Sequence, residues 1–166
     1  SAFKPFAYAE LFNKGYPDST ILFDVKTEFN PLCAPDGNQA KDKYGQDCYH
    51  PKNYDDTFRG PVDLRHAIAQ SLNVPSVKLL YLVGINDTIA TAKDMGITTL
   101  NDPKRYGLSL VLGGAEVTLL EMTSAFGAFS QDGILHQKTS ILKIENSDGA
   151  GIEEKKDAAI PVIDTQ

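Results

Sequence analysis

Apolar residues recur at helical spacing in five segments of the chain, most of which end at a glycine or begin at a capping residue. After Asp63, a good N-cap, apolar positions repeat at i, i+3, i+4, i+7 and i+8, and Ser71 takes one of these places. The segments predicted as helices are 2–14, 64–72, 75–82, 86–95 and 117–130. One stripe of the last segment carries Leu119, Met122, Phe126 and Phe129.

Extended structure is predicted at two places. Residues 20–25 are β-rich and predict a short strand, and the turn sequence at 146–149 predicts a hairpin over 140–154. Residues 30–61 contain neither valine nor isoleucine and are punctuated by proline and glycine, which indicates a long loop or a surface insertion. The pattern therefore predicts a mainly α domain with a short C-terminal β-hairpin and no internal repeat.

The composition is that of an ordinary globular domain. With 166 residues, 42% hydrophobic and 23% charged, the chain is long enough for one domain with a core. Its net charge of −6 argues against nucleic acid as a partner, because a duplex-binding surface concentrates positive charge. The densest apolar stretch, residues 77–85, is shorter than the roughly 20 residues that cross a bilayer, and no signal peptide is visible.

Two cysteines, Cys33 and Cys48, lie in the polar segment 30–61. Three interpretations are open: two free surface thiols, a disulfide, or part of a metal site with His50. The metal site would lack a fourth ligand and a Cys-x-x-Cys spacing, so we expect neither a metal nor another cofactor. A disulfide requires an oxidising compartment, where closing a loop of this length would stabilise the fold by roughly 3 kcal/mol.

Ser1 and Lys4 stand three residues apart at the start of the first predicted helix, so they would project from one face. A serine hydroxyl becomes a good nucleophile when a neighbouring amine of lowered pKa removes its proton. The partial positive charge at a helix N-terminus disfavours the ammonium and so favours such a base. Alternatively, Ser1 is a helix cap and Lys4 a solvated side chain, the usual meaning of an isolated Ser-x-x-Lys.

Ser71 and Asn73 form a second polar pair, at a junction between two predicted helices. A serine and an asparagine at such a junction can donate and accept protons beside a reaction centre. Alternatively, they cap the end of one helix and the beginning of the next.

Together, the two pairs match two of the three motifs of the serine acyl-transferring enzymes that recognise penicillin. They stand as Ser1-Ala-Phe-Lys4 and Ser71-Leu-Asn73. The chain resembles the transpeptidase domain of class A penicillin-binding proteins in three longer phrases: SAFKPFAYAELFNKGY, PKNYDDTFRGPVDLRHAIAQSLNVPSVKLLYLVG and GLSLVLGGAEVTLLEMTSAFGAFSQDG. The resemblance runs from residue 1 to about residue 154, with gaps mainly in the Cys33–Cys48 loop.

The resemblance implies a fold, a reaction and a site. The fold is the helical portion of the α+β penicillin-binding transpeptidase fold, which is serine β-lactamase-like, and residues 1–166 are a partial transpeptidase domain. Ser1 would attack the D-alanyl-D-alanine carbonyl of a peptidoglycan stem peptide, with Lys4 as its base. Ser71 and Asn73 would relay the proton to the leaving amine and hold the substrate amide, and a second stem peptide would then take the acyl group. β-Lactams, which resemble the dipeptide, would trap Ser1.

The third motif of that family, Lys-[Ser/Thr]-Gly on a strand, is absent from the chain. That strand pairs with the substrate and helps to build the oxyanion hole. The near matches at 138–140 and 26–28 lack the glycine, and a Cβ at that place would obstruct the close approach of the backbones. We therefore expect a fragment that is inactive in isolation.

The resemblance also implies a parent protein on the extracytoplasmic face of the bacterial cytoplasmic membrane, anchored there and carrying a glycosyltransferase domain. Two other functions stay open. In the first, the chain is a catalytically inert fragment or a non-enzymatic binding module that keeps only the helical region. In the second, it is an N-terminal-nucleophile hydrolase in which the α-amino group of Ser1 is the base. The helical pattern of residues 2–14 disfavours the hydrolase, because those enzymes open with a β-strand.

Overall fold

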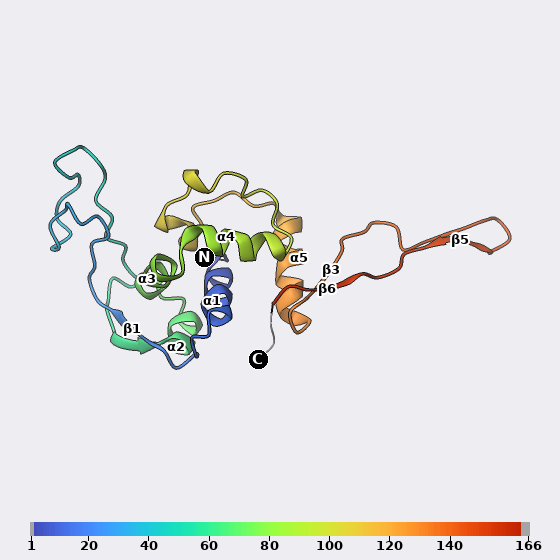
Figure 1. Ribbon diagram of the computed structural model, residues 1–166, viewed down its shortest axis with the longest axis horizontal. Helices are drawn as coiled ribbons and strands as arrows, with labels where there is room; N and C mark the ends of the chain where they lie inside the picture. The colour runs from blue at the N-terminus through green and yellow to red at the C-terminus, as the bar shows by residue number, and fades with distance from the viewer. Residues whose placement is uncertain (1, 164–166) are drawn as a thin grey trace. The chain divides into compact units, whose positions relative to one another are not determined.

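The computed structural model describes residues 2–163 of the chain. They form two compact units: the first holds the residues up to Ile89 together with Asp102–Glu116, and the second holds Ala90–Asn101 and the residues from Val117 onward. Helices make up most of the regular structure, and the strands are short and paired in twos (Figure 1). The sequence prediction of a mainly α chain is therefore confirmed. None of the described helices is both long and apolar enough to cross a bilayer.

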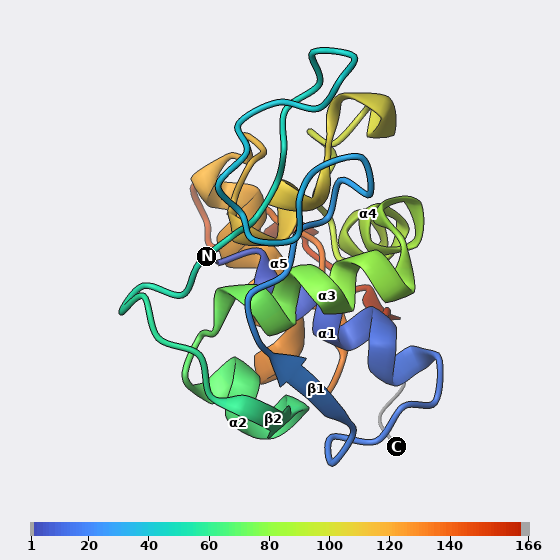
Figure 2. The ribbon, with the colours of Figure 1, turned by 90° about the vertical axis from the view of Figure 1, so that its left-hand side faces the viewer.

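Helices α1 (Lys4–Asn13) and α3 (Asn73–Val83) form the centre of the first unit (Figure 2). They contact each other, and the 3-10 helix η2 (Leu108–Leu112) contacts both. The large side chains that are fully buried in this unit include Phe6, Tyr8, Leu11, Leu64, Leu79, Leu80 and Leu110. Burying a side chain of this kind contributes about 1.5–3 kcal/mol, so apolar packing fixes the position of α1 beside α3.

The start of α1 differs from the sequence prediction by two residues. Phe3 is the N-cap and makes no side-chain capping bond. Pro5 lies in the first turn, where its missing N–H costs nothing, and the chain leaves the helix at Gly15 with φ 85°. The predicted helix is confirmed in its body and corrected at its N-terminus.

Strand β1 (Ile21–Asp24) confirms the predicted strand and pairs antiparallel with β2 (Gly60–Asp63). Leu22 and Asp24 are buried, whereas the alternate residues Ile21 and Phe23 are exposed. β2 was not predicted, because its backbone partners come from a strand far away in the sequence. The predicted loop over 30–61 therefore ends in a strand.

Helix α2 (Leu64–Ala69) begins at the predicted cap. The Asp63 carboxylate accepts a hydrogen bond of 2.7 Å from the backbone N–H of His66. The helix is only six residues long, so the prediction of one continuous helical face through Ser71 is wrong.

The segment between β1 and β2 is held by a disulfide between Cys33 and Cys48, whose Cα atoms are 5.8 Å apart. Beside it, the Glu28 carboxylate accepts hydrogen bonds from the backbone N–H of Asn30 and of Tyr49, at 2.8 and 2.6 Å. Of the three interpretations of the cysteines, the disulfide is confirmed. Because both sulfurs are in that bond, neither is a free thiol or a metal ligand.

Helix α4 (Ile85–Asp94) follows α3 after Gly84, and the 3-10 helix η1 (Pro103–Arg105) precedes η2. In the second unit, helix α5 (Leu119–Ser130) begins at Thr118, whose side chain accepts from the N–H of Glu121. The Glu121 carboxylate in turn accepts 2.6 and 3.0 Å bonds from the hydroxyl and N–H of Thr98. The side-chain hydrogen bond from Thr98 is the main cause that lowers the pKa of Glu121 to about 2.

The apolar stripe predicted on α5 is not its buried face. The buried residues of α5 are Glu121, Ala125 and Ala128, whereas Leu119 and Phe126 are exposed. Periodicity locates an apolar stripe on a helix, but only the neighbouring elements decide which face is covered.

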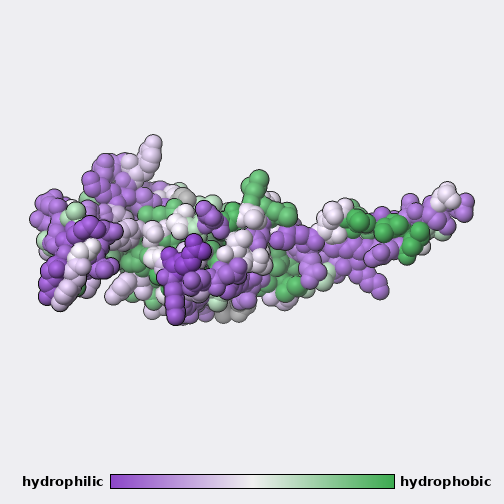
Figure 3. All heavy atoms as spheres, turned by 90° about the horizontal axis from the view of Figure 1, so that it is seen from above, coloured by the Kyte–Doolittle hydropathy of each residue, from purple (hydrophilic) through white to green (hydrophobic). Residues whose placement is uncertain are grey.

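The second unit also contains two pairs of antiparallel strands. β4 (Lys143–Glu145) pairs with β5 (Gly151–Glu154), which confirms the predicted hairpin over 140–154. β3 (Ile134–His136) pairs with β6 (Ala159–Pro161), a pairing that the sequence did not predict. Figure 3 shows apolar atoms at the surface along the hairpin, whose exposed apolar side chains include Ile141, Leu142, Ile144 and Ile152.

Candidate active site

Three of the four residues singled out in the sequence meet in the first unit. The Lys4 Nζ atom donates to the backbone oxygen of Ser71 at 2.5 Å, to Ser71 Oγ at 3.0 Å and to Asn73 Oδ1 at 2.8 Å. Lys4 lies in the first turn of α1, and the other two lie at the junction of α2 and α3. The fourth residue, Ser1, is outside the described residues.

The geometry of Ser71 follows from the way α2 ends. Ser71 has φ 53°, in the left-handed region, and its N–H donates to the oxygen of Ile68 while the N–H of Leu72 donates to that of Ala67. This pair of bonds closes a helix C-terminus, a place that usually holds glycine because a Cβ there costs about 1–2 kcal/mol. The turn leaves both the carbonyl and the hydroxyl of Ser71 within reach of Lys4.

Asn73 lies at the beginning of a helix rather than in a break between helices. Leu72 is the N-cap of α3, Asn73 is its first residue and Pro75 lies within the first turn. Because proline lacks an N–H that a first turn would leave unpaired, Pro75 continues the helix here. The helix predicted over 75–82 therefore begins two residues earlier, at Asn73.

Lys4 is buried, with 2% of its surface exposed, so the interpretation of a solvated lysine is wrong. Burial lowers its pKa from 10.5 to about 8 because the charged form loses its hydration. Its three described acceptors are neutral oxygens, which orient the amine without a carboxylate to hold the proton. An amine in this setting can accept a proton near neutral pH.

Tyr8, one helical turn beyond Lys4, is not a competing base. Its hydroxyl lies 3.4 Å from Ser76 Oγ, and burial raises its pKa to about 12. The phenol therefore keeps its proton at physiological pH.

Two further residues support the junction and were missed in the sequence. Asn53 Oδ1 accepts from the N–H of Asn73 at 2.8 Å, and Asn53 Nδ2 donates to both oxygens of Asp24 at 2.9 Å. A signal for Asp24 was present, because it stands two places after Leu22 on the inward face of the predicted strand. Asn53 stands in an irregular segment, where no periodicity marks it.

The near matches to the third motif do not lie on strands. Residues 138–140 are in the irregular segment between β3 and β4, and residues 26–28 follow the end of β1. Thr27 Oγ1 donates to the oxygen of Val25, so this hydroxyl serves a local turn.

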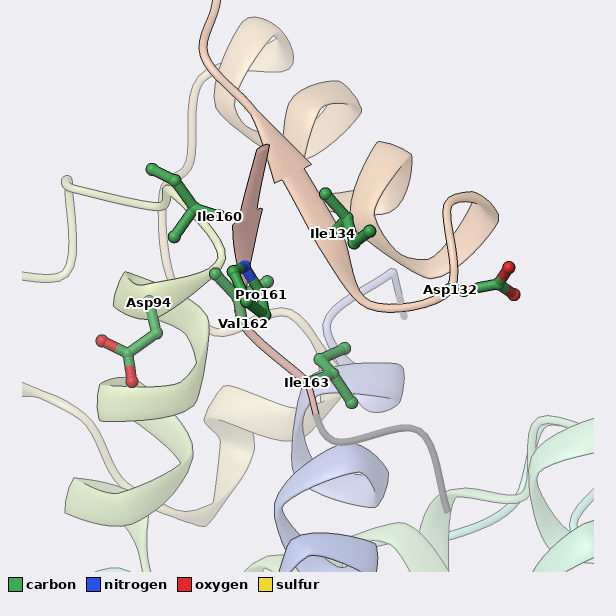
Figure 4. Close-up of a pocket in the computed structure, with 7 residues that line it drawn as sticks. All are labelled: Asp94, Asp132, Ile134, Ile160, Pro161, Val162 and Ile163. Carbon is green, nitrogen blue, oxygen red and sulfur yellow. The ribbon is translucent and has the colours of Figure 1, made fainter. Parts of the chain in front are cut away.

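A hollow in the second unit offers no comparable chemistry. It is lined by Asp94, Asp132, Ile134, Ile160, Pro161, Val162 and Ile163, and the Asp132 carboxylate points away from the isoleucines (Figure 4). Among these described lining residues there is no serine, cysteine, lysine or histidine.

Comparison with known proteins shows which proteins the chain is similar to. No family model matches the chain. The penicillin-binding protein 1A of Pseudomonas aeruginosa is 30% identical over 162 residues, which are 98% of this chain and 18% of that protein. The penicillin-binding protein 1A of Aquifex aeolicus is 36% identical over 155 residues, which are 93% of this chain and 19% of that protein. This chain is homologous to class A penicillin-binding protein 1A.

Solved structures agree with this homology. The crystal structure of penicillin-binding protein 1A from Haemophilus influenzae matches 96% of this chain and 22% of its own, with a TM-score of 0.78 and 28% identity. PonA1 from Mycobacterium tuberculosis matches 97% of this chain and 42% of its own, with a TM-score of 0.76 and 17% identity, a likeness of fold alone. The expected fold, a mainly α part of the penicillin-binding transpeptidase fold, is confirmed.

This homologue of penicillin-binding protein 1A spans less than a fifth of the length of the two curated relatives compared above. Its described residues hold the lysine of one motif against the serine and asparagine of the other. The sequence separations of 67 and 69 residues are bridged by the packing of α1 against α3.

Proposed function

We propose that this chain is the helical part of a peptidoglycan-crosslinking D,D-transpeptidase that works through an acyl-serine intermediate. The observation that carries the proposal is the set of three hydrogen bonds from Lys4 Nζ to Ser71 and Asn73. These bonds put a buried amine of lowered pKa beside a hydroxyl and an amide, the groups that serine acyl transfer needs around its nucleophile. Homology to penicillin-binding protein 1A supports a penicillin-binding, peptidoglycan-related role.

In the proposed reaction, the Ser1 hydroxyl oxygen forms a bond to the carbonyl carbon of the D-alanyl-D-alanine peptide, and Lys4 Nζ takes the hydroxyl proton. The carbon–nitrogen bond then breaks, and the proton reaches the leaving amine by way of Ser71 Oγ, 3.0 Å from Lys4 Nζ. D-Alanine leaves and an acyl ester remains on Ser1. The amine of a second stem peptide attacks this ester, which forms the crosslink and returns the hydroxyl.

Asn73 has a separate part in the proposal. Its Oδ1 accepts from Lys4, and its Nδ2 donates to the backbone oxygen of Lys52 at 2.9 Å. The amide therefore holds the amine in place, and we propose that it also contacts the substrate amide. β-Lactams are the second class of ligand that we propose, because they present the same carbonyl to Ser1.

We place the protein on the extracytoplasmic face of the bacterial cytoplasmic membrane, anchored there and joined to a glycosyltransferase domain. The disulfide between Cys33 and Cys48 supports this compartment, because disulfides persist where the environment is oxidising.

The experiment uses the natural protein at its full length and a fluorescent penicillin. The unaltered protein should be labelled, with the adduct mapped by mass spectrometry to Ser1. Lys4→Ala should abolish labelling, because it removes the base. Lys14→Ala is the matched control: Lys14 follows α1 and binds the oxygen of Val83 and Asp87, away from the junction. Labelling of Lys4→Ala at the unaltered rate, or an adduct elsewhere than Ser1, would refute the assignment.

A further inference from the structure

A buried carboxylate stands behind the candidate site. Asp24, at the end of β1, has 0% of its surface exposed. Its two oxygens accept from Asn53 Nδ2 at 2.9 Å each, and one also accepts from the backbone N–H of Arg59 at 3.0 Å. Lys78, on α3, donates to the backbone oxygen of Phe23 at 2.7 Å. Asp24 is therefore held by hydrogen bonds and its direct partner is the neutral side chain of Asn53.

The contacts of Asn53 allow only one orientation of its amide. Nδ2 faces three oxygens, the two of Asp24 and the backbone oxygen of Thr57 at 2.8 Å, and oxygens of these kinds only accept. Oδ1 faces two donors, the N–H groups of Asn73 at 2.8 Å and Val74 at 3.3 Å. Reversing the amide would set donor against donor at one end and acceptor against acceptor at the other.

These contacts make Asn53 the cap of a helix that begins 20 residues later. Leu72, at the N-cap position of α3, has no side-chain oxygen to offer the first N–H groups of the helix. Asn53 supplies that oxygen from the segment between β1 and β2. The capping bond fixes the backbone of Asn73, one of the residues of the proposed site.

The residue before Asn53 fixes the side chain of Asn73. The backbone oxygen of Lys52 accepts from Asn73 Nδ2 at 2.9 Å, which leaves Asn73 Oδ1 to accept from Lys4 at 2.8 Å. Residues 52 and 53 therefore hold the backbone of Asn73 through one bond and its amide through another. A working site tolerates displacements of only about 0.5 Å. Because Asn73 binds the Lys4 amine, the two contacts that hold Asn73 also limit the movement of that amine.

We propose that Asp24 and Asn53 are positioning residues that orient Asn73, and through it Lys4, for acylation of the serine. Asp24 locks the amide of Asn53, and Asn53 locks the first turn of α3 with the help of the Lys52 carbonyl. The proposal rests on the proposed function only in that the oriented groups are those of the transpeptidase site.

The test uses the natural full-length protein and separates binding of a penicillin from the acylation step by saturation kinetics. Asp24→Asn keeps the size of the side chain but removes the charge that dictates the orientation of Asn53. We expect the acylation rate constant to fall by about tenfold or more, while the dissociation constant changes by less than about threefold. Amide hydrogen exchange in the first turn of α3 should become faster in the same variant.

A matched control removes a similar carboxylate elsewhere. Asp42, in the loop that the disulfide closes, is also buried and also accepts from an asparagine amide, Asn30 Nδ2, at 3.0 Å. Asp42→Asn should leave the acylation rate constant within about twofold of the unaltered value.

The outcomes distinguish the two proposals. If the unaltered protein is not acylated, the proposed function fails, and hydrogen exchange alone then decides whether Asp24 and Asn53 hold the start of α3. If the unaltered protein is acylated, either an unchanged rate constant in Asp24→Asn or an equal loss in Asp42→Asn overturns the positioning role.

Discussion

The Nζ atom of Lys4 lies 2.8 Å from Oδ1 of Asn73, although 69 residues separate them in the chain. One belongs to the first turn of α1 and the other to the first turn of α3, so the packing of these two helices sets the distance. The amine also touches the backbone oxygen and the hydroxyl of Ser71. All of these partners are neutral and the amine is buried, which lowers its pKa. The same contacts therefore contribute to the stability of the fold and to the proposed role of Lys4 as a base.

Replacing Lys4 by alanine should destabilise the fold as well as abolish acylation. The oxygens of Ser71 and Asn73 would lose the hydrogen bonds that Lys4 Nζ donates to them, and a hydrogen bond typically contributes about 0.5–1.5 kcal/mol. Urea denaturation of the variant measures the loss. Lys14→Ala, which removes a half-exposed lysine with a surface ion pair to Asp87, should cost less than Lys4→Ala, because exposed ion pairs contribute little to stability. Equal losses in the two variants would contradict the burial of Lys4.

Stability should rise with pH above about 8 because of Lys4. Its pKa is about 8 in the folded chain and takes its ordinary value of 10.5 in the unfolded chain. Between these values the unfolded chain binds a proton that the folded chain has lost, so the free energy of unfolding increases with pH. Tyr8, with a pKa raised from 10.0 to about 12, acts in the opposite direction, but only above pH 10.

Unfolding free energies between pH 7 and pH 10 test this dependence. The difference between the unaltered protein and Lys4→Met isolates the lysine, because methionine does not titrate. A difference that stays constant over this range would show that the pKa of Lys4 is not lowered.

Ser71→Gly and Ser71→Ala should differ in stability while sharing a defect in acylation. Both variants lose the hydroxyl that lies 3.0 Å from Lys4 Nζ, so both should acylate more slowly than the unaltered protein, although less severely than Lys4→Ala. Only glycine relieves the left-handed backbone, φ 53°, so it should be the more stable of the two by about 1 kcal/mol. Thermal denaturation decides this, and an alanine variant as stable as the glycine variant would argue against the turn described for Ser71.

Breaking the disulfide should loosen the segment between β1 and β2. The bond joins Cys33 and Cys48 across 15 residues, and a crosslink of this span typically stabilises by about 3 kcal/mol. Intact mass after alkylation without reductant should show no modified thiol, and urea denaturation with and without reductant should show the loss of stability. Two alkylated thiols in protein from its native compartment would exclude the bond there.

The 166-residue chain alone should be acylated poorly by penicillin. Its sequence contains no Lys-[Ser/Thr]-Gly motif, and in the proposed enzyme the strand with this motif would supply part of the oxyanion hole. One lost donor of that kind costs about 10²–10³ in rate. Intact mass after incubation with a penicillin measures the adduct, and a rate equal to that of the full-length protein would show that the missing strand is not required.

Much of the local structure was accessible from the sequence. The bodies of α1, α4 and α5, the cap at Asp63 and the hairpin over 140–154 depend on residues close together in the chain, so spacing and turn chemistry identify them. The two short motifs, with the longer phrases around them, also indicated the family that the comparisons then identified.

The tertiary structure decided what depends on residues far apart. Strands β2, β3 and β6 exist only through pairing with distant partners, and the left-handed turn at Ser71 ended a helix that periodicity alone would continue. The burial of Lys4 and the cap that Asn53 gives to α3 likewise need α1, α3 and the segment before β2 to be packed together. By itself, the sequence determined most of the helices, the first strand, the hairpin over 140–154 and the reactive groups. Their pKa values and mutual distances were set by packing, because desolvation and hydrogen bonding depend on neighbours that are remote in the chain.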